Sequence, residues 1–141
     1  MKIVVNTCYG GFSLSHEGCL RYLELAGKKV WLEENEKYKS IGPTYWLVPK
    51  EERVEDLSSK EWHKLSLEQR IAHNEAQKGQ TFYCRDLMRD DPILVRVVEE
   101  MGEKANGSCA SLDIREIPDG IEWQIEEYDG REWIAEKHRT W

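Results

Sequence analysis

Runs of β-branched and alternating apolar residues predict strands along this chain, and apolar residues spaced three and four apart predict helices. Strands are predicted at residues 2–6, 29–32, 45–48, 81–84, 112–117, 121–126 and 132–138. Two main helices are predicted at residues 16–26 and 92–101, the second with Pro92 in its first turn, where a missing N–H is tolerated. A helix with a thinner apolar face is predicted after Ser66, where the sequence fits a reciprocal capping box.

The order of these elements predicts an α+β fold with a mixed, mostly antiparallel sheet. Strand 2–6, helix 16–26 and strand 29–32 have the lengths of a right-handed parallel crossover. The last third of the chain predicts a C-terminal antiparallel β-meander, with Asp129-Gly130 as a hairpin turn. We expect one ligand-binding domain over residues 1–141, in which residues 33–80 are a variable, partly helical segment.

The net charge and the cysteine content argue against several classes of function. The 141 residues carry a formal net charge of −7, which argues against a broad nucleic-acid surface but leaves room for a small phosphate ligand. No apolar run approaches the roughly 18 residues of a membrane span, and we expect a cytoplasmic protein with no membrane partner. Four widely spaced cysteines without a Cys-x-x-Cys pair predict reduced thiols, with no metal site and no cofactor.

The first candidate site is the stretch NTCYGGFSLS, residues 6–15, where a glycine pair lies between a strand and a helix N-terminus. Glycines let a ligand approach the backbone, and the N–H groups that begin a helix attract anions. Asn6 and Tyr9 can hydrogen-bond a sugar or a phosphate. The alternative is that Gly10 and Gly11 form only a tight turn, since neither Gly-x-x-x-x-Gly-Lys-[Ser/Thr] nor Gly-x-Gly-x-x-Gly is present.

The second candidate site is residues 82–91, FYCRDLMRDD, which combine two aromatic residues, two arginines and three aspartates between a strand and a helix. Aromatic faces stack on bases, and guanidinium groups bind phosphate in a bidentate manner. The alternative is that the arginines pair with the aspartates at the surface, while one aspartate caps the following helix.

A resemblance to a known family rests on three stretches: KIVVNTCYGGFSLS, RDDPILVRVVEEMGEKANG and IPDGIEWQIEEYDGREWIAEKHRTW. They are similar to a group of small phage and prophage proteins, which resembles the first-described kind of Thoeris anti-defence sponge proteins. The resemblance implies a homo-oligomer with pockets at subunit contacts, in the host bacterial cytoplasm. It implies that a cyclic ADP-ribose isomer, or in some relatives a cyclic oligonucleotide, is sequestered without being cleaved.

The resemblance and the side-chain chemistry together suggest a binding site and no enzyme. The expected ligand-binding residues are Asn6, Tyr9, Gly10, Gly11 and Phe12 as a phosphate and ribose wall, Phe82 and Tyr83 as a base stack, Arg85 and Arg89 as phosphate contacts, and Asp90 or Asp91 as a hydroxyl acceptor. Two alternatives stay open. One is a nucleotide-processing enzyme that uses Cys8 or an aspartate of residues 86–91, and the other is an acidic inhibitor that binds only a host protein.

Overall fold

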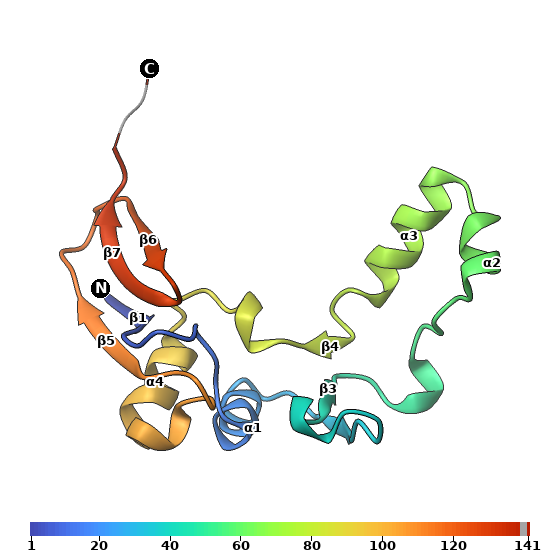
Figure 1. The fold of residues 1–141 in the computed structure, drawn as a ribbon, viewed down its shortest axis with the longest axis horizontal. Helices are drawn as coiled ribbons and strands as arrows, with labels where there is room; N and C mark the ends of the chain where they lie inside the picture. Colours follow the sequence, from blue (N-terminus) through green and yellow to red (C-terminus); the bar gives the residue numbers. More distant parts are fainter. Residues whose placement is uncertain (139–140) are drawn as a thin grey trace. The chain divides into compact units, whose positions relative to one another are not determined.

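The computed structural model describes residues 1–138 and 141, and the chain divides into two compact units (Figure 1). Unit 1 combines residues 1–27 with residues 84–141, and unit 2 is the intervening segment 28–83. Unit 2 is thus inserted in the sequence of unit 1. Helices and antiparallel strand pairs occur in both units, which confirms the predicted α+β class.

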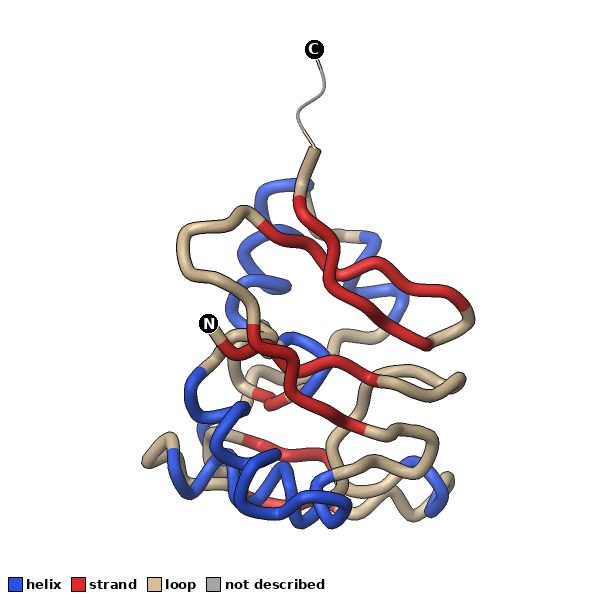
Figure 2. The backbone as a smooth tube through the Cα atoms, turned by 90° about the vertical axis from the view of Figure 1, so that its left-hand side faces the viewer, coloured by secondary structure: helices blue, strands red, loops and turns tan. Residues whose placement is uncertain are grey.

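Unit 1 contains two strand pairs and the two main helices. Its elements are β1 (Lys2–Asn6), α1 (His16–Leu25), η3 (Cys84–Asp86), α4 (Pro92–Met101), η4 (Gly102–Ala105), β5 (Leu112–Glu116), β6 (Trp123–Tyr128) and β7 (Arg131–Glu136). β1 pairs with β5 in antiparallel register, and β6 pairs with β7 around the predicted Asp129-Gly130 turn. β1 also contacts β7, so the hairpin lies beside the β1–β5 pair (Figure 2).

The core of unit 1 lies between β1 and the two helices. Ile3, Val4 and Val5 of β1 are fully buried, as are Leu94 and Val97 of α4. Burying an aliphatic side chain of this size contributes about 1.5–3 kcal/mol. α4 begins where predicted, because the Asp91 carboxylate accepts the N–H of Ile93 and Pro92 needs no partner for its nitrogen.

Unit 2 is built from short elements around a small antiparallel sheet. They are β2 (Trp31–Glu33), η1 (Lys39–Ile41), β3 (Thr44–Trp46), η2 (Lys50–Glu52), α2 (Ser59–His63), α3 (Leu67–Gln77) and β4 (Thr81–Phe82), with β3 between β2 and β4. The predicted capping box is present, since Ser66 and Gln69 exchange hydrogen bonds at the start of α3. Among residues 28–83, Phe82 is the one buried apolar side chain. No helix in the described chain has the length and hydropathy to cross a bilayer.

Two predicted strand arrangements are wrong. The parallel crossover does not form, because β1 pairs with β5 while β2 is a short, exposed strand that pairs with β3 in unit 2. The first strand of the predicted meander also leaves its sequence neighbour and pairs with β1 instead. The physical reason is the burial of β1, whose backbone groups need partners that water cannot supply.

Candidate binding site

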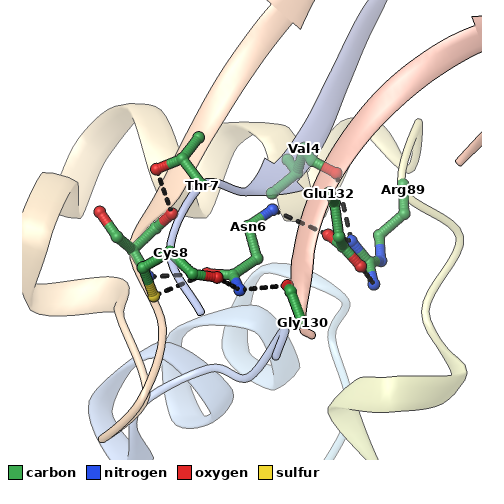
Figure 3. Close-up of polar contacts among 8 residues, drawn as sticks. Val4, Asn6, Thr7, Cys8, Arg89, Gly130 and Glu132 are labelled. Atoms are coloured by element: carbon green, nitrogen blue, oxygen red, sulfur yellow. Dashed lines mark hydrogen bonds and ion pairs between the residues drawn. The ribbon is translucent and has the colours of Figure 1, made fainter. Parts of the chain in front are cut away.

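The end of β1 is organised by the fully buried side chain of Asn6 (Figure 3). Its amide nitrogen donates to the carbonyl oxygens of Cys8 (2.8 Å) and Gly130 (2.7 Å). Its amide oxygen accepts the backbone N–H of Ser111 at 2.8 Å. One amide therefore joins the loop after β1, the segment before β5 and the turn between β6 and β7. Asn6, one of the predicted ligand contacts, is thus buried and hydrogen-bonded within unit 1.

Arg89 and Glu132 cover the edge of β1 that β5 leaves open (Figure 3). The N–H of Val4 donates to the carbonyl of Arg89 at 2.9 Å, and the guanidinium Nη1 lies 3.4 Å from the Val4 carbonyl oxygen. Glu132 accepts the N–H of Asn6 at 2.8 Å. The Arg89 carbonyl and the two side chains thus take the place of a neighbouring strand.

The same two side chains form a bidentate ion pair. Nη1 and Nη2 of Arg89 lie 2.6 and 2.8 Å from the carboxylate oxygens of Glu132, whose side chain is 7% exposed. The Arg89 guanidinium also lies 3.6 Å from the centre of the Phe12 ring, which is buried. Arg89 and Phe12, both expected to contact a ligand, are therefore engaged inside unit 1.

The glycine pair lies where three backbone segments meet. A Cβ on Gly10 would come within 2.4 Å of the Cys109 carbonyl oxygen, and a Cβ on Gly130 would come within 2.4 Å of the Gly11 nitrogen. Gly10 and Gly11 have φ values of 147° and 108°, and the N–H of Gly10 donates to Asp129 at 3.2 Å. Close packing of this kind is a sufficient reason for glycine at positions 10 and 130, whereas at Gly11, where a Cβ would meet no atom within 4 Å, the positive φ is the reason.

The N-terminus of α1 is capped by Ser15 and not by the glycine pair. The Ser15 hydroxyl accepts the N–H of Gly18 at 3.0 Å and donates to the Lys104 carbonyl at 2.6 Å. The N–H of Ser15 donates to the Ala105 carbonyl at 2.9 Å. The first turn of α1 therefore packs against η4.

The residues of the second candidate site are divided between the two units. Phe82 and Tyr83 belong to unit 2, where the Phe82 ring packs edge-on against Tyr45 and Tyr83 is 60% exposed. Arg85 is exposed in unit 1. Asp91 caps α4 and accepts the Tyr22 hydroxyl at 2.5 Å. Burial, followed by this hydrogen bond and the Asp91 charge, raises the pKa of Tyr22 far above its usual value.

Asp90 lies elsewhere in unit 1. It is half-buried and lines a small cavity of about 450 Å³ together with Lys2 and Arg96. The structure thus brings together Asn6, Phe12 and Arg89 at the end of β1, whereas Asp90 and Asp91 lie elsewhere in unit 1.

A larger open groove in unit 1 lies across the ends of four strands. Its volume is about 660 Å³, and it is lined by Thr7, Tyr9, Arg115, Glu116, Ile117, Tyr128, Arg131, Glu132, Trp133 and Ile134. We call this set the strand-end groove. Three of its aromatic side chains are open to solvent: Tyr9 is 61% exposed, Tyr128 72% and Trp133 45%. Of the expected site residues, Tyr9 is the one that lines it.

The charged side chains that line the strand-end groove differ in whether they form ion pairs. Glu132 is committed to Arg89, and Arg115 pairs with Asp113 on its own strand. The Arg115 hydrogen bond, together with the N–H of Ile114, lowers the pKa of Asp113. Arg131 makes no ion pair with any residue among 1–138 and 141. Among the described residues, the groove therefore offers one guanidinium without an ion pair, that of Arg131, beside exposed aromatic rings.

Sequence reasoning missed Arg115, Tyr128, Arg131 and Trp133 as possible site residues. Three of them could have been predicted from the sequence. Arg131 and Trp133 are two residues apart on a predicted strand, so their side chains share one face. Tyr128 is paired with Arg131 across the hairpin turn and lies on the same face. The place of Arg115 in the groove could not be predicted in this way, because it depends on the pairing of β5 with β1.

Comparison of the chain with protein-family models, with curated proteins and with solved structures finds no match. Within the described residues, no group of three or more His, Cys, Asp or Glu side chains has the arrangement of a metal site. The strand-end groove is therefore the feature on which a functional proposal depends.

Proposed function

We propose that this protein binds a cyclic ADP-ribose isomer or a related cyclic nucleotide and sequesters it without cleaving it. In this proposal it is a phage anti-defence protein that acts in the host bacterial cytoplasm and keeps the signal from its receptor. The resemblance to Thoeris anti-defence sponge proteins suggests the ligand class. The observation that carries the proposal is the strand-end groove, in which exposed aromatic rings lie beside an uncommitted arginine.

The chemistry of the groove suits an anionic ligand with aromatic bases. Exposed faces of Tyr9, Tyr128 and Trp133 supply stacking surfaces, each worth about 1–3 kcal/mol per base. Arg131 can bind a phosphate through a charge-assisted hydrogen bond, worth about 1.5–3 kcal/mol. Glu116 is an acidic group in the same lining and favours the ribose hydroxyls over the phosphates as its partners.

The resemblance also implies assembly of several copies around shared pockets. The exposed aromatic residues of the strand-end groove are the surface that we propose a second copy would cover. Light scattering with and without ligand measures this directly. A mass that stays at one subunit under both conditions would contradict the oligomer and leave the groove as a complete site in one chain.

The central experiment is retention followed by release. Purified protein is incubated with cyclic ADP-ribose isomers and cyclic dinucleotides, unbound ligand is filtered off, and the protein is heated. Mass spectrometry of the released molecule is expected to find the ligand unchanged. A cleaved product would favour the enzyme alternative. Failure to retain any ligand would reject the proposal and favour a partner protein for the acidic chain.

Two substitutions test whether the ligand lies in the strand-end groove. Trp133→Ala and Arg131→Ala are each expected to weaken binding about 10- to 100-fold, because one removes a stacking ring and the other a phosphate contact. Arg96→Ala is the matched control, since Arg96 is exposed and pairs with Glu100 on α4. Unchanged affinity in folded Trp133→Ala and Arg131→Ala proteins, measured by calorimetry, would move the site elsewhere.

A further inference from the structure

The hairpin of β6 and β7 leaves one edge of β6 without a neighbouring strand. In the described chain, β6 pairs with β7 and with no other strand (Figure 1). Just beyond the two strands, the N–H of Lys137 donates to the carbonyl of Glu122. Hydrogen-bonded and non-hydrogen-bonded pairs alternate along an antiparallel ladder. Residues 124, 126 and 128 therefore bond to β7, whereas residues 123, 125 and 127 do not.

The backbone groups of Trp123, Ile125 and Glu127 are thus directed away from β7. Within the described residues, no hydrogen bond engages the N–H or the carbonyl group of any of the three. We call this row of backbone groups the β6 edge. An extended peptide can add to such a row as a further strand, because it supplies the missing donors and acceptors in the same spacing.

The outer edge of β5 is different, because its own side chains protect it. The N–H groups of Leu112 and Ile114 donate to the side-chain oxygens of Asn106 and Asp113, at 2.9 and 2.8 Å. An added strand would have to displace both side chains before it could accept these N–H groups. Of the two outer strands in unit 1, β6 is therefore the one that is ready to pair.

Glutamates determine which kind of strand fits the β6 edge. Glu122, Glu126 and Glu127 are exposed, and none of them forms an ion pair with another described residue. β6 itself has the sequence WQIEEY and contains no basic residue. A second copy that paired through β6 would bring these carboxylates together from both chains, and like charges destabilise neighbouring strands. A strand with basic side chains would instead complement them.

We propose that the β6 edge binds an extended, basic segment of a partner protein as an added antiparallel strand. The segment places basic side chains opposite Glu126 and Glu127, and an apolar side chain opposite the half-buried Ile125. Antiparallel pairing is the commoner of the two arrangements. The proposal is independent of nucleotide binding, because it uses the backbone of β6 and two glutamates that do not line the strand-end groove.

Peptide titrations followed by amide chemical shifts test the proposal on the full chain. The probe is the capped peptide Thr-Lys-Arg-Val-Thr-Val, whose Lys, Arg and first Val lie opposite Glu127, Glu126 and Ile125 in the antiparallel register. The control peptide has Glu in place of Lys and Arg. We expect saturable shifts centred on residues 123–127 with the basic peptide, and about 10-fold weaker binding of the control.

Two outcomes of this titration would overturn the proposal. One is that neither peptide shifts residues 123–127, which would mean that the glutamates only prevent unwanted strand pairing. The other is that the same amides shift when the protein is concentrated without peptide, which would mean that a second copy occupies the β6 edge.

N-methylated peptides separate strand addition from charge attraction alone. A methyl group on the nitrogen of the first Val removes the N–H that would donate to the carbonyl of Ile125. A methyl group on the nitrogen of Arg replaces an N–H that points away from β6, so that peptide is the matched control. We expect the first change to abolish binding and the second to leave it nearly unchanged. Equal effects of the two changes would reject strand addition.

Charge reversal on the protein tests the part of the glutamates. The variant Glu126→Lys/Glu127→Lys is expected to bind the acidic peptide more tightly than the basic one. Glu55→Lys/Glu75→Lys is the matched control, because both residues are exposed in unit 2 and the net charge changes by the same amount. The control should keep the preference for the basic peptide. If that preference also survived in Glu126→Lys/Glu127→Lys, the contact would lie away from β6 and the proposal would be wrong.

Discussion

Each unit contains an arginine that lies over an aromatic ring and pairs with a glutamate, yet the two clusters differ in the burial of the glutamate. In unit 1, Arg89 lies 3.6 Å from the centre of the Phe12 ring and pairs with Glu132, whose side chain is 7% exposed. In unit 2, Arg53 lies 4.1 Å from the centre of the Trp46 ring and pairs with Glu33, whose side chain is 54% exposed.

The difference shows that burial determines how much an ion pair contributes to the free energy of unfolding. An exposed ion pair contributes about 0–1 kcal/mol, because water screens it. Removing one member of a buried pair costs about 3–5 kcal/mol, since the other charge is left without compensation. The Arg89 cluster also supplies the hydrogen bonds of a missing strand to β1, whereas the Nε atom of Arg53 is buried without a partner in the described chain.

The largest expected effect comes from Arg89→Ala. It leaves the Glu132 carboxylate buried beside the N–H of Asn6, and we expect a loss of about 3–5 kcal/mol in the free energy of unfolding. Urea denaturation measures the change. Arg21→Ala is the control, because Arg21 pairs with Glu100 at the surface of the same unit and should cost about 1 kcal/mol or less. Equal losses in the two variants would mean that burial is not the deciding factor.

A smaller effect is expected from Gly130→Ala, two residues before Glu132. The new methyl group would meet the Gly11 nitrogen at 2.4 Å, which forces the loop around the buried cluster to move. Gly120→Ala is the matched control, because its φ of 83° is similar to the 87° of Gly130 but no atom lies within 4 Å. We expect Gly130→Ala to lower the free energy of unfolding by about 1–3 kcal/mol more than the control does.

A third test extends the comparison to pH. Tyr22→Phe removes a hydroxyl that donates to the Asp91 carboxylate, and we expect a loss of about 1.5–3 kcal/mol at pH 7. Because the pKa of Tyr22 is raised in the folded state, its contribution is complete below the unfolded value of about 10 and declines at higher pH. Urea titrations from pH 8 to pH 11 should show the wild-type advantage over Tyr22→Phe shrinking above pH 10. A constant difference across this range would contradict the assignment.

The smallest effect is expected from Arg53→Ala in unit 2. It removes one solvent-screened ion pair and one cation–π contact, so a loss of about 1 kcal/mol is expected. Amide hydrogen exchange should detect it within residues 28–83 and leave β1 unchanged. Faster exchange at Val4 and Val5 would mean that the two units unfold as one.

The sequence predicted the elements whose signals are local. Asp91-Pro92 and the apolar spacing after them identified α4, and Ser66 with Gln69 identified the start of α3. Pairing of β1 with β5 could not be foreseen, because Val4 and Ile114 are far apart in the chain and both candidate partners of β1 were plausible strands. Nor could the role of Asn6, since a polar residue after an apolar run looks like the solvent-exposed end of a strand.

The partners of β1 have a consequence for synthesis on the ribosome. β1 contains three buried apolar residues, but Arg89, β5 and Glu132, which complete its two edges, come much later in the chain. Until Glu132 has left the exit tunnel, residues 2–6 are an unpaired, aggregation-prone segment. Unit 2 draws its sheet from residues 31–82 and is free to form before unit 1 does. Unit 2 is therefore expected to fold before the two segments of unit 1, which fold together.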